Sequence, residues 1–376
     1  MEEVEPLSVE DAFGDLKDPR SRSPEHPLSE LLVVAIAAIL SGADSWVGIA
    51  TWGEAKIEWL RQYVRLANGV PSHDTFGRVF AMLDAKHFEA CFVRWVGGLC
   101  QGLEGKVVAI DGKTVRRSHR LGQGAIHLVS AYCGALRVSL GQVKTEAKSN
   151  EITAIPELLE ALLLKGAVVT IDAMGCQHAI AQKIVQGGAD YVLAVKDNQP
   201  GLCEALRELF AAHDARGLKT VRFGEHTEIG KDHGRIETRR CVVSEDIGWL
   251  AQRERWCGLR SVAMIESTRQ IGEHSSTERR YYISSLAADA KRLGGAIRGH
   301  WGIENSMHWV LDVAFGEDQC RARVKNAAQN FAILRRIVIN LLRADSTTKV
   351  GAKTKRLKAS ADDRYRAHIL GLVALR

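Results

Sequence analysis

The sequence predicts a mixed α/β protein (α+β overall), in which an all-helical N-terminal domain precedes an α/β core that carries a β-rich insertion. Apolar residues recur at spacings of three and four up to about residue 104, strand-like runs begin at Lys106, and short alternating runs fill residues 214–286. The chain has 376 residues, enough for about two to three domains. Its 46% apolar and 26% charged residues are typical of an ordinary globular protein.

Residues 1–104 are expected to form the helical domain, a candidate for binding DNA. Its longest apolar run, Leu31–Leu40, is shorter than the roughly twenty residues that cross a bilayer, so we expect a core helix. Another helix is expected to begin after Ser72, a good N-cap, with Arg78 on its exposed side. This helix could contact DNA, as in helix-turn-helix proteins, or could be an ordinary capped core helix.

The cysteines and the start of the chain predict a cytoplasmic location. The eight cysteines form no CxxC pair and no grouping with zinc-finger spacing, so we expect buried thiols in a reducing cytosol. The acidic start, MEEVEPLSVEDAF, lacks the basic and then apolar order of a signal peptide. No membrane partner is expected.

The core begins with three strand-like runs, VVAID, AIHLVSAYC and ALRVSLGQVKT, separated by glycine-containing turns as in a meander. A helix is expected after Asn150, which is a good cap, and ends at Lys165–Gly166. The strand AVVTIDA, a helix at about 177–185 and the strand DYVLAV follow. This order is that of a ribonuclease-H-like fold. We therefore expect a core at 105–213, the insertion at 214–286, a core-completing helical part at 287–344 and a basic C-terminal segment at 345–376.

Three carboxylates are candidate catalytic residues and metal ligands. Asp111 and Asp172 follow apolar strand-like runs, and Glu304 lies in a predicted helix. Two carboxylates at strand ends, together with a third carboxylate on a facing helix, can hold two hard divalent cations such as Mg²⁺, which prefer oxygen ligands. Such a pair of ions activates a water or hydroxyl and stabilises the leaving oxygen of a phosphodiester.

Plainer explanations exist for each acid on its own. The dipeptide Asp111–Gly112 is a common turn, and Asp172 could simply cap the helix that follows it. Asp312, eight residues after Glu304, falls on roughly the same helical face and competes with it. Asp197 is a second competitor.

Several residues near these acids are candidates for contacting DNA, although a solvated charged surface explains most of them nearly as well. Alternation in HGRIETR predicts a DNA-facing ribbon or a surface of cross-strand ion pairs. An aromatic ring beside Glu304 could stack on an extruded base, although core packing is the more common use of Trp301 and Trp309. The candidates are Lys113, Arg116, Arg117, Lys196, Asn198, His233, Arg235, Arg239, His300 and Trp301.

The net charge of +6 is weak evidence for a polyanionic partner, but the charge is unevenly distributed. Thirteen Lys or Arg residues stand against three acidic residues between Arg321 and Arg366. We expect an apolar helix here with Arg335 and Arg336 on its polar side. The run KTKRLK is expected either to bind DNA or to form a flexible solvated tail.

The sequence resembles the DDE transposases of bacterial insertion sequences, and within them the ISAs family that includes the H-repeat-associated proteins. The matching motifs span nearly the whole chain, and their order and spacing make chance improbable. They are KDPRS (17–21), Gly69 with PSHDTFGRVF (71–80), AIDGKTVRRS (109–118), KSNEITAIPELL (148–159), TIDAMGCQ (170–177), VKDNQ (195–199), HGRIETR (233–239) and HWGIENSMHWVLDVAFGEDQCR (300–321).

The resemblance implies a ribonuclease-H-like catalytic core, dependence on Mg²⁺ or Mn²⁺, and cleavage and transfer of DNA strands at element ends. It implies that Asp111 bridges two ions while Asp172 and Glu304 each complete one. Double-stranded DNA, as terminal inverted repeats and target, is the implied partner of a homodimer or higher oligomer. The broader group often shows a Tyr-Arg-Glu-Lys signature, but His300 and Leu311 occupy its Arg and Lys positions here, so phosphate contacts of that signature are not carried over.

Three alternatives remain open at this point. The first is a catalytically inactive DNA-binding protein derived from a transposase, and the second is a ribonuclease-H-like nuclease of repair or RNA processing. The third, a glycosidase with a pair of carboxylates, would need no metal.

Overall fold

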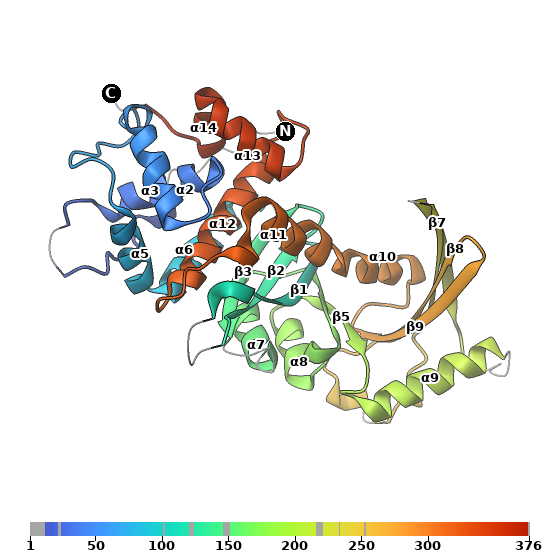
Figure 1. Ribbon diagram of the computed structural model, residues 1–376. Helices are drawn as coiled ribbons and strands as arrows, with labels where there is room; N and C mark the ends of the chain where they lie inside the picture. The colour runs from blue at the N-terminus through green and yellow to red at the C-terminus, as the bar shows by residue number, and fades with distance from the viewer. Residues whose placement is uncertain are drawn as a thin grey trace.

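The computed structural model describes residues 12–21, 24–100, 102–119, 124–145, 151–215, 221–232, 234–251 and 253–374. Its centre is one nine-stranded sheet with the strand order β3-β2-β1-β4-β5-β9-β8-β7-β6. The ribbon in Figure 1 shows helices at one end of this sheet and the long β hairpins at the other. The strands are β1 (Val107–Thr114), β2 (His127–Cys133), β3 (Val138–Thr145), β4 (Val168–Ile171), β5 (Asp190–Val195), β6 (Gly224–Asp232), β7 (Arg235–Ser244), β8 (Ser261–Ile271) and β9 (His274–Ser284).

The first five strands confirm the predicted ribonuclease-H-like core. β1 pairs antiparallel with β2 and parallel with β4, and β4 pairs parallel with β5. Parallel neighbours need crossover connections, which α7 (Glu151–Ala161) and α8 (His178–Gln186) supply. β2 and β4 are buried along their whole length, as expected for strands covered on both faces. The predicted helix cap Asn150 lies outside the described residues.

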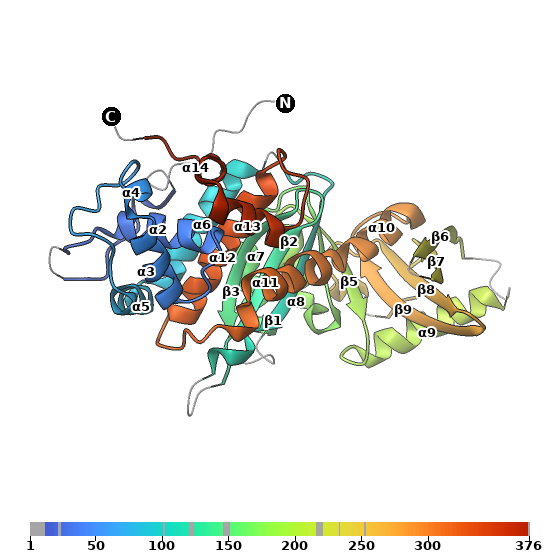
Figure 2. The same cartoon turned by 45° about the horizontal axis from the view of Figure 1, so that its top comes forward.

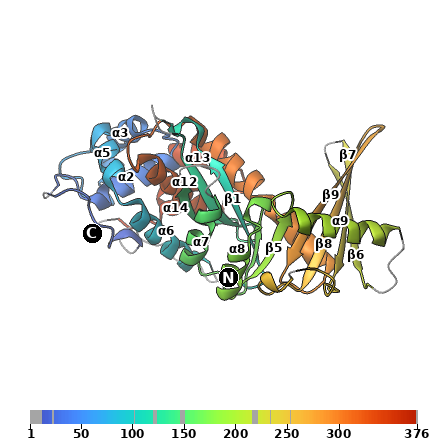
Figure 3. The same cartoon turned by 90° about the horizontal axis from the view of Figure 1, so that it is seen from below.

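The β-rich insertion continues the core sheet. β9 pairs antiparallel with β5, with Val192 opposite Ser284, and β8, β7 and β6 follow outward. The hairpins extend well beyond the core, with α9 (Pro200–Asp214) beside them, as the view in Figure 3 shows. Two further elements return the chain to the core, namely α10 (Ala290–His300) and a π-helical turn at Ile303–His308 that leads into α11 (Trp309–Phe315).

The N-terminal helices share their apolar core with the C-terminal part of the chain. They are α2 (Leu28–Leu40), α3 (Trp46–Ala55), α4 (Ile57–Leu60), α5 (His73–Met82) and α6 (Ala85–Leu99). α12 (Ala327–Ala344) packs against α2, α5 and α6, and one buried cluster extends from Ala12 to Leu370. α5 begins as predicted, because the Ser72 hydroxyl accepts a hydrogen bond from the Thr75 N–H. The N-terminal and C-terminal helices therefore share one buried apolar core, although they are far apart in the sequence.

One expectation for the basic C-terminal part is wrong, and a second is wrong in part, since Lys353 and Lys358 of the run KTKRLK are exposed. Arg335 and Arg336 lie inside the protein, not on a polar side of α12. The run KTKRLK forms part of α13 (Ala352–Ala361), in which Lys355 and Arg356 are buried and donate hydrogen bonds to backbone carbonyls. These two cations satisfy the carbonyls of helix ends and loops, so they belong neither to a flexible tail nor to a DNA-binding surface.

Among the described residues, the helices are too short or too polar for any of them to traverse a bilayer.

Candidate active site

Asp111 and Asp172 lie side by side at the ends of two parallel strands. In the register of β1 and β4, Ile110 is opposite Ile171, so the next residue on each strand is one of the acids. The Asp172 carboxylate also accepts hydrogen bonds from the N–H groups of Met174 and Gly175, at 3.0 and 3.4 Å. The cap that was an alternative explanation for Asp172 is therefore present, and it holds the carboxylate at the strand end.

Burial, together with the charges of Asp172, Glu304 and Glu151, raises the pKa of Asp111 to about 7, although the hydrogen bond from the Gly112 N–H opposes this shift. The Asp111 side chain is 18% exposed. Carboxylates that crowd together in a poorly solvated place repel one another, which favours the protonated form. A group of this kind is stabilised in its charged form when a cation joins it.

Glu304 reaches the same place from the helical segment. Together with Asp111 and Asp172 it lines one cavity of about 170 Å³, which Lys196, His300 and Trp301 also line. Glu304 lies within the π-helical turn Ile303–His308. Such turns interrupt α-helical spacing and often occur at functional sites, since they change the direction of the side chains that follow.

Neither competing acid lines this cavity. Asp312 instead forms an ion pair with Lys113, and Asp197 is exposed. The expectation that Asp312 shares a face with Glu304 assumed a continuous α-helix. The π-helical turn between the two residues changes that spacing.

His300 and Trp301 both line the cavity, with different properties. The His300 ring hydrogen-bonds the Thr170 hydroxyl at 3.1 Å, and burial lowers its pKa, so the ring is neutral at pH 7. Trp301 is 38% exposed and Trp309 is 61% exposed, so the expectation of core packing for both rings is wrong. The Arg280 guanidinium lies over the Trp301 ring, 4.8 Å from its centroid.

The geometry does not support a DNA contact for Lys113. Its ammonium group is buried among three carboxylates, those of Asp312, Glu317 and Asp318. Glu317 is fully buried and also pairs with Arg336 at 3.1 Å. The sequence analysis missed this internal network of ion pairs, because charged residues such as Glu317 and Arg336 are usually expected at the surface. The one sequence signal in this region was the motif that includes residues 316–318.

The other predicted contacts near the acids differ in their accessibility. Arg116 is exposed and pairs with Asp318 at 3.2 Å, and Arg117 is exposed. Lys196 is exposed at the cavity. The Asn198 amide donates to the carbonyl of Ala173 and therefore braces the turn after Asp172.

A groove of about 610 Å³ runs from the insertion to the cavity and shares with it Arg280, Trp301 and Glu304. Arg235 and Arg239 of β7 line this groove, and both pair with Glu237, which also pairs with Arg269 at 3.2 Å. Cross-strand ion pairs are therefore present, while the groove still carries more arginines than glutamates. The predicted contact His233 lies outside the described residues.

The comparisons with known proteins identify the family of this chain. The family model described as "Transposase DDE domain" matches residues 102–341, and one described as "DDE_Tnp_1-associated" matches residues 10–96. The chain belongs to the DDE transposase family. Within that family it is of the H-repeat-associated type, which confirms the resemblance found in the sequence.

The relatives extend over nearly the whole chain. "Putative transposase YncI" of Escherichia coli O157:H7 is 45% identical over 352 residues, which cover 92% of this chain and 90% of that protein. "H repeat-associated putative transposase YhhI" of Escherichia coli strain K12 is 41% identical over 356 residues, which cover 92% and 93%. A solved structure of a piggyBac transposase synaptic complex with hairpin DNA is similar only at a TM-score of 0.43 and 9% identity, over 96% of this chain and 76% of that chain. The family domain implies dependence on a divalent metal ion.

Proposed function

We propose that this protein is an active transposase that cleaves DNA at the ends of its insertion element and transfers the freed strands into target DNA. The observation that carries the proposal is the convergence of Asp111, Asp172 and Glu304 on one cavity. They come from two neighbouring strands and a helical turn that lies 132 residues further along the chain than Asp172. A groove with one more arginine than glutamate opens into the same cavity, and this small positive excess favours a polyanion.

The three carboxylates fit a site for Mg²⁺ or Mn²⁺, both in their donor atoms and in their electrostatics. All three donors are carboxylate oxygens, which hard divalent cations prefer. Burial, and after it the charges of the neighbouring carboxylates, raise the pKa of Asp111, and a bound cation would offset both effects. We propose that Asp111, Asp172 and Glu304 hold two such ions. When bound, they would stabilise charge on the attacking and leaving oxygens of a phosphodiester.

The protein's own residues hold this arrangement and supply its remaining charge. The backbone of β1 and the cap at Asp172 fix two carboxylates, so little reorganisation is required when substrate binds. Lys196 lines the cavity as a cation that can neutralise phosphate, whereas Arg280 lines it but pairs with Glu278 at 2.8 Å. His300 is neutral and can offer a hydrogen bond but no charge, so it does not replace the arginine of the broader signature.

The proposal is tested by incubating the purified protein with a duplex that contains the end of its own element, in Mg²⁺, in Mn²⁺ or in EDTA. We expect metal-dependent nicking at the end boundary, and joining of the freed 3′ end to a target duplex. Glu304→Gln should lower the cleavage rate by more than about 100-fold, because loss of an outer-shell partner alone typically costs about 10–100-fold in metal affinity or activity.

Asp312→Asn is the matched control, because it also neutralises a carboxylate of the same helical segment but outside the cavity. It should retain most of the cleavage activity, and both variants should bind the end duplex like the parent, since phosphate contacts elsewhere supply most of the affinity. Binding without cleavage in any metal would indicate an inactive DNA-binding relic. Cutting without regard to the element end would indicate a general nuclease.

Two element ends must be cut and joined together, so we propose that the protein acts as a homodimer or higher oligomer on DNA. Light scattering on the protein with and without end duplex tests this, and one protomer per pair of ends would contradict it.

A further inference from the structure

A second group of cations lies away from the insertion groove. It comes from three segments: α5, the turn Arg116–Ser118 that follows β1, and the loop that joins α11 to α12. We call this group the α5-side basic face and define it by Arg78, Arg116, Arg117, Arg321, Arg323 and Lys325.

Hydrogen bonds between the segments make this face one continuous surface. The Arg323 guanidinium donates a hydrogen bond to the Arg117 carbonyl at 2.8 Å, which ties the loop to the turn after β1. The Asn326 amide donates to the Leu83 carbonyl at 3.0 Å, which ties the same loop to the end of α5. Arg78 and Arg321 both line one groove of about 580 Å³. The loop that joins α11 to α12 therefore links the other two segments of the face.

The positive charge of the face is largely unneutralised. Within the described parts of the chain, Arg116 is the one member with an ion pair, to Asp318. The Arg78 guanidinium donates to the Thr75 hydroxyl, which carries no charge. Of the two acids of the groove, Asp44 pairs with Arg356 at 2.9 Å, whereas Asp74 lies 3.5 Å from His73, which is a counter-charge only when protonated. Like charges held together without counter-charges favour a polyanionic partner.

The α5-side basic face is connected to the acid cavity through strand β1. β1 carries Asp111 and runs on through Thr114 into the turn with Arg116 and Arg117. The insertion hairpins and α5 lie toward opposite ends of the molecule, as Figures 1 and 2 show. The face and the insertion groove therefore lie on different sides of the acid cavity.

We propose that the α5-side basic face binds the DNA duplex on the side of the cleaved phosphate opposite to the part that the insertion groove holds. This inference rests on the proposed function, because it assumes that a duplex crosses the acid cavity. Five of its six cations are arginines, whose planar guanidinium groups suit bidentate contact with phosphate. The face thereby positions the duplex by backbone contacts that carry no base sequence themselves.

The test compares Arg78→Ala/Arg117→Ala/Arg321→Ala with a control triple, Arg65→Ala/Lys165→Ala/Lys349→Ala, which removes three exposed cations elsewhere. Both triples are made in an Asp111→Asn background, so that DNA is bound but not cut. Fluorescence anisotropy measures the affinity for an end duplex at salt concentrations from about 50 to 200 mM. Each phosphate that a cation neutralises adds about −0.9 to the slope of log affinity against log salt. Removing three such cations should change the slope by about 2.7, so the parent should lose about 40-fold more affinity over this range than the variant.

Duplexes truncated on one side or the other of the cleavage boundary locate the contact. One truncation should abolish the difference in salt slope between the face triple and the parent, while the other truncation should preserve this difference. Equal salt slopes for the two triples, or a difference that survives both truncations, would overturn the proposal. Far-ultraviolet circular dichroism and thermal unfolding exclude a folding defect, and Arg→Lys exchanges at the same three positions should restore most of the slope.

This readout is independent of cleavage. If end cleavage is absent from the parent but the face triple still changes the salt slope on one truncated duplex, the proposed catalytic function fails while the DNA contact stands. If cleavage occurs and the slopes are equal, the contact fails alone.

Discussion

Glu317→Gln should strongly destabilise the protein, although Glu317 lies outside the acid cavity. Its carboxylate is fully buried and bridges two cations, with 2.9 Å to the Lys113 ammonium and 3.1 Å to the Arg336 guanidinium. Removing one partner of a buried pair costs about 3–5 kcal/mol, because it leaves the other charge uncompensated. Lys113 keeps Asp312 and Asp318, whereas Arg336 keeps only the Ala332 carbonyl and the Ser130 hydroxyl in the described structure. We therefore expect a loss of about 3 kcal/mol.

Urea denaturation at pH 7 measures this loss, and Asp312→Asn is the control. The Asp312 side chain is 32% exposed, so its pair with Lys113 should be worth about 0–1 kcal/mol. Both variants replace a carboxylate that pairs with Lys113 by an amide. The comparison therefore isolates the effect that burial of the carboxylate has on stability. If Glu317→Gln is no more destabilising than Asp312→Asn, the buried bridge does not hold this part of the fold.

The same substitution has a defined pH signature. Although burial opposes ionisation of Glu317, Lys113, Arg336 and Arg335 hold its pKa well below the ordinary 4.5. A depressed pKa in the folded state stabilises the protein above pH 4.5, and this contribution is lost as the pH falls below that value. The free energy of unfolding of the parent should therefore fall faster than that of Glu317→Gln below pH 4.5, by up to about 1.4 kcal/mol per pH unit. Parallel curves would contradict the reasoning.

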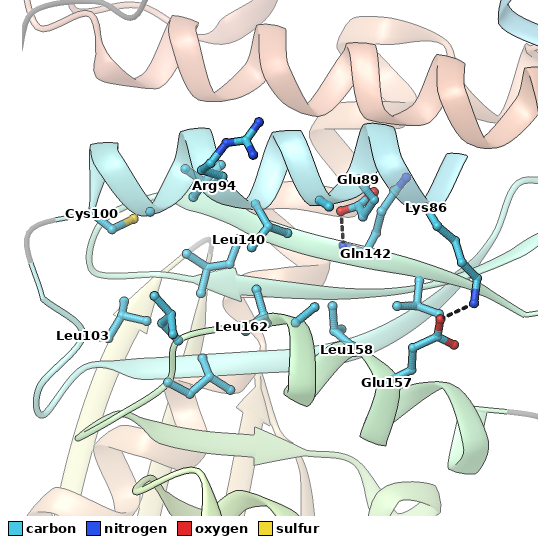
Figure 4. Close-up of a pocket in the computed structure, with 18 of the residues that line it drawn as sticks. Lys86, Glu89, Arg94, Cys100, Leu103, Leu140, Gln142, Glu157, Leu158 and Leu162 are labelled. Atoms are coloured by element: carbon cyan, nitrogen blue, oxygen red, sulfur yellow. Dashed lines mark hydrogen bonds and ion pairs between the residues drawn. The ribbon is translucent and has the colours of Figure 1, made fainter. Parts of the chain in front are cut away.

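Two further predictions concern buried neighbours of the core strands. Glu89 lies in a large cavity between α6, β3 and α7, where one of its oxygens accepts the Gln142 N–H and the other has no partner in the described structure (Figure 4). Burial raises the pKa of Glu89 to about 8, so its contribution to stability should be lost as the pH rises from 4.5 to about 8. Glu89→Gln should therefore be more stable than the parent at pH 9 by a few kcal/mol, at about 1.4 kcal/mol per pKa unit, and chemical denaturation that shows no gain would refute this. Gly112→Ala should cost about 1–3 kcal/mol and impair cleavage, because the added Cβ would lie 2.3 Å from the Glu151 carboxylate and 2.4 Å from the His127 ring beside Asp111. Gly201→Ala, whose Cβ would meet nothing within 4 Å, is its control, and equal melting temperatures and cleavage rates for the two variants would count against that explanation.

Local patterns were sufficient to predict the order of the core elements. Short runs of β-branched residues around Ile110 and Ile171, with glycines between the runs, favour buried strands over helices. The cap at Ser72 is equally local, since one hydroxyl satisfies one N–H three residues away. Two of the proposed ligands follow directly from these strands, because residues after neighbouring parallel strands end at one edge of a sheet.

The tertiary structure alone decided which charges are surface and which are core. Arg335, Arg336, Lys355 and Arg356 occur in sequence contexts like those of exposed cations but are buried, and the Lys113 side chain is only 10% exposed. Glu317 pairs with Lys113 and Arg336, and carbonyls of other segments accept hydrogen bonds from Lys355 and Arg356. The packing of the N-terminal helices against the C-terminal helices is likewise a long-range feature. The sequence by itself thus determined the strands, caps and candidate acids, which depend on neighbours along the chain. Only the fold decided the partners of each charge, because ion pairs and burial depend on distances in space.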